Sequence, residues 1–221
     1  MGSLAGLYLF LLGLAGGVTL LTLSSFRRVS PAWLRWLLIG SGLLVLGRYA
    51  AMACFATASA PEPVWALRRL WFATSFAFPL QSAFAVDQLL RHPAMTPKKL
   101  LRWLSPWLLV SGAVILVGGM QPVPDRVIGW SVRLTPGWQG LLAIAHGLFV
   151  AGFLAACLLF LRKVPGRSIR VALLGLIAAQ LCLALDGLVL AAGGWYFRPY
   201  LYSELLMLLA LWHAYETGAA P

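Results

Sequence analysis

Residues 168–217 read SIRVALLGLIAAQLCLALDGLVLAAGGWYFRPYLYSELLMLLALWHAYET, and this stretch decides the class of fold. Two apolar runs flank the GGW turn at 193–195, and each contains one carboxylate, Asp186 in the first and Glu204 in the second. An ionisable side chain inside a hydrocarbon-length segment is expensive to bury, so it marks a functional site and needs a partner. Arg48, inside an earlier apolar run, is the natural candidate. The stretch therefore predicts a polar site within a bundle of membrane helices.

The composition places the whole chain in the same class. Of its 221 residues, 61% are hydrophobic and 10% are charged, and the mean hydropathy is +0.87. A soluble domain carries about 25% charged residues, so the composition excludes one. At about 20 apolar residues for each membrane helix, the length suits one bundle of seven. We therefore predict an all-α, polytopic membrane protein with a single domain over residues 1–221.

The net charge of +11, from 17 basic and 6 acidic residues, has two possible origins. A basic chain can bind nucleic acid, but basic loops beside anionic lipid headgroups explain the charge more simply in so apolar a sequence. The expected partner is therefore the lipid bilayer, and no nucleic acid is expected.

Charged residues and clusters of proline and glycine divide the sequence into seven apolar segments. We expect helices at about 4–26, 32–55, 64–90, 99–117, 138–161, 168–192 and 196–217. The third segment contains Pro79, where we expect a kink. The longest connection, 118–137, holds three prolines and is expected to be a loop.

The distribution of lysine and arginine predicts the orientation. The loops after the first, third and fifth segments, with the adjoining helix ends, hold 11 basic residues, and the opposite side holds 5. The 11 are Arg27, Arg28, Arg35, Arg91, Lys98, Lys99, Arg102, Arg162, Lys163, Arg167 and Arg170. Because basic loops stay in the cytoplasm, we expect the N-terminus outside and the C-terminus in the cytoplasm.

Four ionisable residues on four segments share one depth. At a rise of 1.5 Å per residue, Arg48, His146, Asp186 and Glu204 each lie roughly 10–12 Å below the outer boundary. We expect them to line a partly hydrated pocket in the outer half of the bundle, with Arg48 bridging the two carboxylates. His146 would be the member that responds to pH.

Two further residues are candidates for the same pocket, because they share helix faces with the residues above. Gln139 lies seven residues before His146, and Tyr200 lies four residues before Glu204. Two interpretations remain open. Arg48 with one carboxylate can be a purely structural link between helices, or the group can form a pocket that responds to a ligand or a proton.

The sequence offers little for a metal or a cofactor. It has three histidines, and no P-loop, HExxH or G-x-S-x-G motif, so we name no metal ligand and no catalytic residue. Seven helices with the N-terminus outside are also typical of microbial rhodopsins, but the last segment has no lysine to bind retinal. Heme ligation by His146 and His213 is not favoured, because the two lie at opposite depths. The identity of any cofactor stays open.

Basic residues and prolines form a pattern over most of the chain. The pattern consists of Arg69-Leu70-Trp71 followed by Pro79, Lys98-Lys99-Leu100-Leu101-Arg102 with Pro106, the start of the sixth segment at Arg167–Arg170, and Pro199 at the start of the last. In these features the chain resembles the heptahelical input domain at the N-terminus of many bacterial sensor histidine kinases and cyclases. The resemblance implies a multi-pass sensor of the bacterial cytoplasmic (inner) membrane. The sequence ends at Pro221 with no kinase or cyclase, so we expect the signal to leave through a cytoplasmic or membrane partner.

The leading hypothesis is a non-enzymatic, receptor-like sensor or binding module for a small molecule or lipid. Arg48 would anchor the ligand, with Asp186 and Glu204 as counter-ions. Three alternatives remain. The chain can be a small proton-coupled transporter, although its charged group lies on one side of the bilayer rather than at the midplane. It can be a membrane-embedded enzyme acting on a lipid or isoprenoid, with these residues as acid and base. It can also be a packing subunit of a larger complex.

Overall fold

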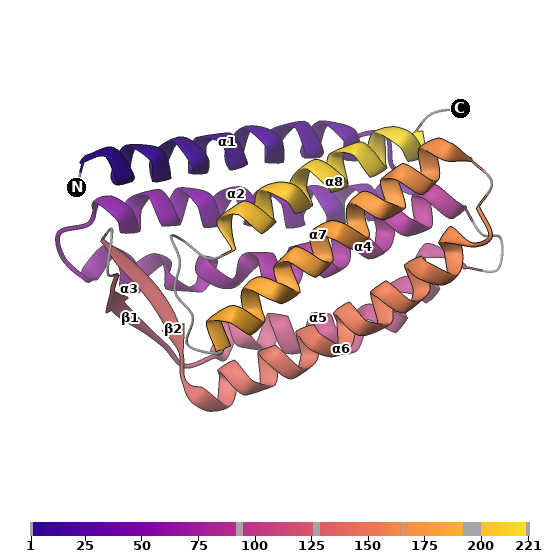
Figure 1. Cartoon of the computed structure of the whole chain (residues 1–221). Helices are drawn as coiled ribbons and strands as arrows, with labels where there is room; N and C mark the ends of the chain where they lie inside the picture. The colour runs from indigo at the N-terminus through magenta and orange to yellow at the C-terminus, as the bar shows by residue number, and fades with distance from the viewer. Residues whose placement is uncertain (1, 92–94, 126–128, 165, 192–199, 220–221) are drawn as a thin grey trace.

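The computed structural model describes the chain except for residues 1, 92–94, 126–128, 165, 192–199 and 220–221. In the described residues, seven long helices run alternately in opposite directions along one bundle (Figure 1). They are α1 (Gly2–Phe26), α2 (Ala32–Thr57), α4 (Ala73–Leu90), α5 (Pro97–Val117), α6 (Pro136–Leu161), α7 (Arg167–Ala191) and α8 (Leu201–Ala219). The predicted helical bundle is thus confirmed. The predicted turn at 193–195 and the predicted start of the last helix at Tyr196 lie outside the described residues.

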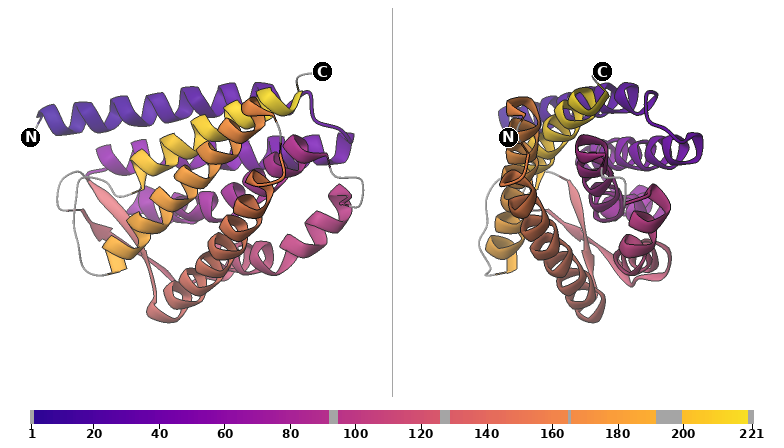
Figure 2. Two further views of the ribbon diagram at one scale, coloured as in Figure 1. Left: turned by 45° about the vertical axis from the view of Figure 1, so that its right-hand side comes forward. Right: turned by 90° about the vertical axis from the view of Figure 1, so that its right-hand side faces the viewer.

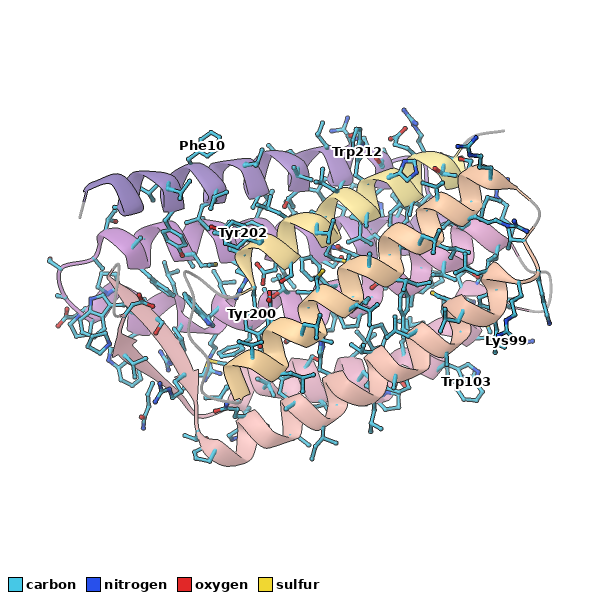
Figure 3. All side chains as sticks on the ribbon, viewed as in Figure 1. Phe10, Lys99, Trp103, Tyr200, Tyr202 and Trp212 are labelled. Carbon is cyan, nitrogen blue, oxygen red and sulfur yellow. The ribbon has the colours of Figure 1, made fainter. Side chains whose placement is uncertain are left out.

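Five of these helices, α1, α2, α5, α6 and α7, are long and apolar enough to cross a membrane. Their outer faces carry large apolar side chains, among them Phe10, Trp103 and Ile144, which are 67%, 71% and 66% exposed. Figure 3 shows Phe10 and Trp103 pointing away from the bundle on opposite sides. Soluble proteins rarely expose apolar surface of this extent. These features indicate a membrane protein.

Of the other two long helices, α4 is surrounded by protein, whereas α8 is buried on one side and exposed along Leu206, Leu209 and Trp212. α4 packs against α2, α5 and α8 and also touches α6 and α7, and α8 lies against α1, α4 and α7. The end-on view in Figure 2 shows the same arrangement of the helices. A helix with protein neighbours on all sides does not need an apolar face toward lipid, so α4 can carry more polar residues. The prediction of seven membrane spans stays a prediction for these two helices.

The third predicted segment is not one continuous α-helix. It consists of α3 (Glu62–Leu67), a 3₁₀ turn η1 (Arg68–Phe72) and α4. In η1, Arg69 Nη1 donates to the backbone carbonyl of Ile115 in α5 at 2.7 Å. The irregular turn therefore lies where an arginine satisfies a carbonyl of the neighbouring helix, a contact that helical periodicity cannot reveal.

The α-helical segment α4 runs through Pro79, because another side chain replaces the hydrogen bond that proline removes. Proline has no N–H to donate to the carbonyl four residues earlier. That carbonyl, of Ser75, accepts instead from Ser111 Oγ of α5 at 3.0 Å. In α5, Pro106 has the same effect on the carbonyl of Arg102, which accepts from Ser105 Oγ at 2.7 Å. Serine hydroxyls thus satisfy both carbonyls that the prolines leave without a backbone donor.

The predicted loop at 118–137 is wrong in part, because it contains a β-hairpin. Strands β1 (Met120–Pro124) and β2 (Trp130–Leu134) pair antiparallel, with Met120 opposite Leu134. Val132 and Leu134 are buried and Arg133 between them is exposed, the two-residue alternation of a half-buried strand. The hairpin packs on a second apolar cluster with residues of α2, α3 and α5. We call this end of the bundle the hairpin end.

Gly129 fixes the turn of the hairpin against the end of α2. Its φ of +54° is in the left-handed region, which favours glycine. A Cβ at this position would lie 2.1 Å from the backbone oxygen of Phe55, so there is no room for one. The turn closes with a hydrogen bond of 2.9 Å from the Asp125 N–H to the Gly129 carbonyl.

We therefore expect Gly129→Ala to lower the free energy of unfolding by at least about 1 kcal/mol, the scale of strain at a left-handed non-glycine residue. The measurement is the thermal unfolding midpoint in a mild detergent. Gly137→Ala is the matched control, because a Cβ at Gly137 meets nothing within 4 Å. Equal midpoints for the two variants would contradict this account of the turn.

Candidate functional site

The centre of the site is an ion pair between α2 and α8. Arg48 Nη2 lies 2.8 Å from Glu204 Oε1, and Arg48 Nε donates to Glu204 Oε2 at 3.4 Å. The guanidinium therefore meets the carboxylate with two of its donors, the arrangement that gives arginine its strength in such pairs. The two side chains are 7% and 3% exposed. The sequence-based pairing of Arg48 with a carboxylate of the last segment is thus observed.

Two further elements complete the surroundings of the pair. Thr74, in the first turn of α4, donates its hydroxyl to Glu204 Oε1 at 3.1 Å. From η1, the Trp71 ring lies with its centroid 5.5 Å from Arg48 Cζ, close enough for a cation–π interaction. The Trp71 ring also stacks on Phe55 of α2 at 5.7 Å. The irregular η1 segment thus supplies an aromatic neighbour to the buried cation.

The hydroxyl of Tyr49 is a loosely held polar group beside the ion pair. Tyr49 is 3% exposed, and its hydroxyl faces the Glu204 carboxylate. Among the described residues it forms no hydrogen bond of ordinary length. A buried hydroxyl whose hydrogen bond is weakened costs up to about 1–3 kcal/mol. A polar group bound beside Glu204 would improve its hydrogen bonding.

Asp186 of α7 is next to the ion pair and has a different role from the one predicted. Its Oδ2 accepts from the backbone N–H of Tyr200 at 3.2 Å and from the hydroxyl of Ser203. It therefore acts as a cap on the start of α8, where helix N–H groups lack partners within the helix. Of the predicted bridge from Arg48 to both carboxylates, the described ion pair is the one with Glu204.

Tyr200 marks the half-buried side of the site. Its φ of +72° is unusual for a tyrosine, and its N–H is bound by Asp186. Its phenol packs over α7, where a Cβ at Gly187 would lie 3.4 Å from the hydroxyl oxygen. Figure 3 shows Tyr200 at the start of α8. Asp186 and Tyr200 are half-buried whereas Glu204 is buried, so polarity extends from the sealed ion pair toward the surface.

The structure does not bring His146 and Gln139 to this site. Both lie on α6, which packs mainly against α5 and α7 and lies across the bundle from α1 and α8 (Figures 1 and 2). His146 is half-buried and Gln139 is exposed. The predicted layer of four ionisable residues therefore reduces to Arg48 and Glu204, with Asp186 beside them. Depth along the bundle was predicted, but depth does not say which helices are neighbours.

A second polar layer lies two helical turns from the first. Ser41 lies seven residues before Arg48 on α2, and Gln81 lies seven residues after Thr74 on α4, about 10.5 Å along each helix. Gln81 Nε2 donates to Ser41 Oγ at 3.0 Å. Tyr215 of α8 donates to the backbone carbonyl of Gln81 at 2.9 Å. The same three helices that meet at the ion pair are therefore joined again further along.

Sequence reasoning missed Tyr49, Trp71, Thr74 and Ser203 as members of the site. Two of these were detectable by adjacency, because Tyr49 follows Arg48 and Ser203 precedes Glu204. Thr74 and Trp71 depend on the 3₁₀ turn, which has no clear signal in the sequence. Among the described residues, no group of three His, Cys, Asp or Glu side chains is placed to hold a metal ion.

No protein-family model matches this sequence, and no curated protein matches it either. The site is therefore interpreted from its own geometry.

The burial of the Arg48–Glu204 pair predicts a large and mutual energetic coupling. Arg48→Met or Glu204→Gln alone leaves a charge unpaired in the interior, and each should lower the free energy of unfolding by about 3–5 kcal/mol. The double variant leaves neither charge, so its loss should be clearly smaller than the sum of the two. The measurement is a double-mutant cycle of reversible unfolding in mixed micelles.

The Arg28–Glu216 pair provides the control for this cycle. Its N–O distance of 2.7 Å is nearly the same, but its side chains are 61% and 36% exposed. The coupling in the cycle of Arg28→Met and Glu216→Gln should therefore not exceed about 1 kcal/mol. Equal couplings in the two cycles would show that burial does not set the strength of the inner pair.

Proposed function

We propose that this chain is a non-enzymatic heptahelical sensor or binding module of a membrane, and that it binds a small molecule or lipid beside the Arg48–Glu204 pair. The observation that carries the proposal is the combination of a sealed ion pair with the buried hydroxyl of Tyr49 next to it. A purely structural link between helices needs one cation and one anion. Here the same site also holds a hydroxyl that faces the carboxylate without a hydrogen bond of ordinary length.

The arrangement also suggests how binding would be transmitted. Glu204 is held by Arg48 of α2 and Thr74 of α4, and its neighbour Ser203 is held by Asp186 of α7. A polar ligand that donates to Glu204 or accepts from Tyr49 competes with these contacts. It therefore shifts the balance between two packings of α8 against α2 and α4, which is the physical basis of a conformational signal.

We further propose the orientation and location that the basic residues favour. All seven long helices cross the membrane, the hairpin end lies outside and the C-terminus lies in the cytoplasm, as the excess of basic residues at the opposite end suggests. The resemblance to bacterial sensor input domains supports the cytoplasmic (inner) membrane of a bacterium as the location. It also supports a cytoplasmic or membrane protein as the partner that receives the signal.

The proposed ligand site is tested by purification in a gentle detergent and mass spectrometry of the small molecules that co-elute. We expect the unmodified protein to retain one enriched compound, and Tyr49→Phe to lose at least nine-tenths of it, because the ligand would bind the hydroxyl that faces Glu204. Tyr202→Phe is the matched control, since Tyr202 is a 46% exposed tyrosine of α8.

Tyr49→Phe removes a single oxygen and keeps the ring, so the fold is expected to survive. Unchanged retention by a folded Tyr49→Phe protein would refute the ligand site. A stoichiometric protein in place of a small molecule would favour the packing-subunit alternative instead.

The proposed orientation is tested by labelling single cysteines on intact cells, after Cys54, Cys157 and Cys182 have been replaced. Ser59 and Ser30 are both exposed serines in connections, one on each side in the proposed topology. A membrane-impermeant maleimide should label Ser59→Cys in intact cells and Ser30→Cys only after the cells are opened. The reverse pattern would invert the orientation, and labelling of both would contradict the proposed span of α2.

A further inference from the structure

A groove at the end opposite the hairpin lies between the first turns of α2 and α5. It has a volume of about 430 Å³ and is lined by Trp33, Lys98, Leu101, Arg102 and Ser105. The four residues of α5 follow the spacing i, i+3, i+4 and i+7, so they share one face of that helix. One face of α5 thus forms one wall, and the indole of Trp33 comes from α2.

The charges of the groove lack a balancing anion among its described lining residues. Lys98 and Arg102 are both exposed and lie four residues apart on the same helix face. Like charges at this spacing destabilise a helix. No residue of the described lining is acidic. An anion bound between the two side chains would replace their repulsion by two attractions.

The two acidic residues near this end of the described chain, Asp87 and Glu216, form no described ion pair with Lys98 or Arg102. Asp87 is half-buried on α4 and outside the lining of the groove. Glu216 pairs with Arg28 at 2.7 Å and accepts from Ser25 at 2.6 Å, so it is already engaged. Because α2 and α5 both begin at the groove, their N-terminal dipoles add to the positive potential.

The apolar part of the groove indicates that the anion belongs to a lipid. Trp33 and Leu101 line it beside the two cations. On the neighbouring surface, Trp36 and Trp103 are 67% and 71% exposed. Figure 3 shows Trp103 pointing outward near Lys99 at this end of the bundle. Tryptophan concentrates at the boundary between headgroups and acyl chains, and basic pockets between membrane helices bind anionic headgroups.

We infer that this groove binds an anionic phospholipid, with the headgroup phosphate between Lys98 and Arg102 and an acyl chain along Trp33 and Leu101. The inference rests on the chain lying in a membrane and is independent of the ligand site at Arg48, which is near the other end of α2. A lipid in the groove would tie the start of α5 to the start of α2 at the side where basic residues are densest.

The experiment is native mass spectrometry of delipidated protein in a neutral detergent, titrated with phosphatidylglycerol. Each basic side chain near an anionic lipid contributes about 1 kcal/mol. The double variant Lys98→Gln, Arg102→Gln should therefore bind phosphatidylglycerol about 30-fold more weakly than the unmodified protein. The control is Arg162→Gln, Lys163→Gln, which removes two exposed charges at the end of α6, outside the groove, and should bind within about twofold.

Four results would overturn the inference. Unchanged affinity in the Lys98/Arg102 variant would remove these side chains from lipid binding, and an equal loss in the Arg162/Lys163 control would show unspecific surface attraction. Equal binding of phosphatidylcholine, whose headgroup has no net charge, would show that the groove does not recognise the net negative charge of the lipid. Tyr49→Phe should bind phosphatidylglycerol normally, so failure of the groove and failure of the proposed ligand site are distinguishable. Competition by millimolar inorganic phosphate would reassign the site to a soluble anion.

Discussion

The arrangement of this bundle depends on the need to pair one buried cation. Arg48 lies well inside α2, where no water can solvate a guanidinium, so the surrounding helices must supply its hydrogen bonds and its counter-charge. Glu204 supplies the charge and Trp71 an aromatic face. Because Arg48 must face Glu204, the pair fixes the rotation of α2 and α8 about their axes. It also accounts for a helix-interrupting 3₁₀ turn at the point where Trp71 meets Arg48.

The central helix α4 also has buried polar groups that need partners on neighbouring helices, at several positions along the bundle. Its polar groups reach four neighbours: the Thr74 hydroxyl reaches α8, the Ser75 carbonyl α5, the Gln81 amide α2 and the Ser82 hydroxyl α7. In an apolar environment the alternative to each contact is an unsatisfied group, so each one specifies a neighbour as well as stabilising it. This explains why α4, which touches more of the other elements than any other described helix does, is less apolar than the five helices that could cross a membrane.

The sequence predicted the helices and the central pair because both follow from simple physical rules. Apolar runs define the helices, and Arg48 and Glu204 match in sign and depth. The placement of His146 failed, because equal depth on α6 does not make α6 a neighbour of α2. The role of Asp186 as a cap depends on the position of Tyr200, whose N–H donates to it at the start of α8. The sequence does not predict the hairpin, because its strands have only five residues each and β1 contains two prolines. Such features arise from tertiary contacts, which local patterns do not encode.

The central claim is that Glu204 is ionised and paired with Arg48 in the bundle interior. Infrared spectroscopy tests it most directly, because an ionised carboxylate and a protonated carboxylic acid absorb at well-separated frequencies. The difference spectrum between the unmodified protein and Glu204→Gln at neutral pH should show the loss of a carboxylate band and no loss of a carboxylic acid band. Loss of a carboxylic acid band instead would mean that Glu204 is neutral. The ion pair would then not be what holds α2 against α8.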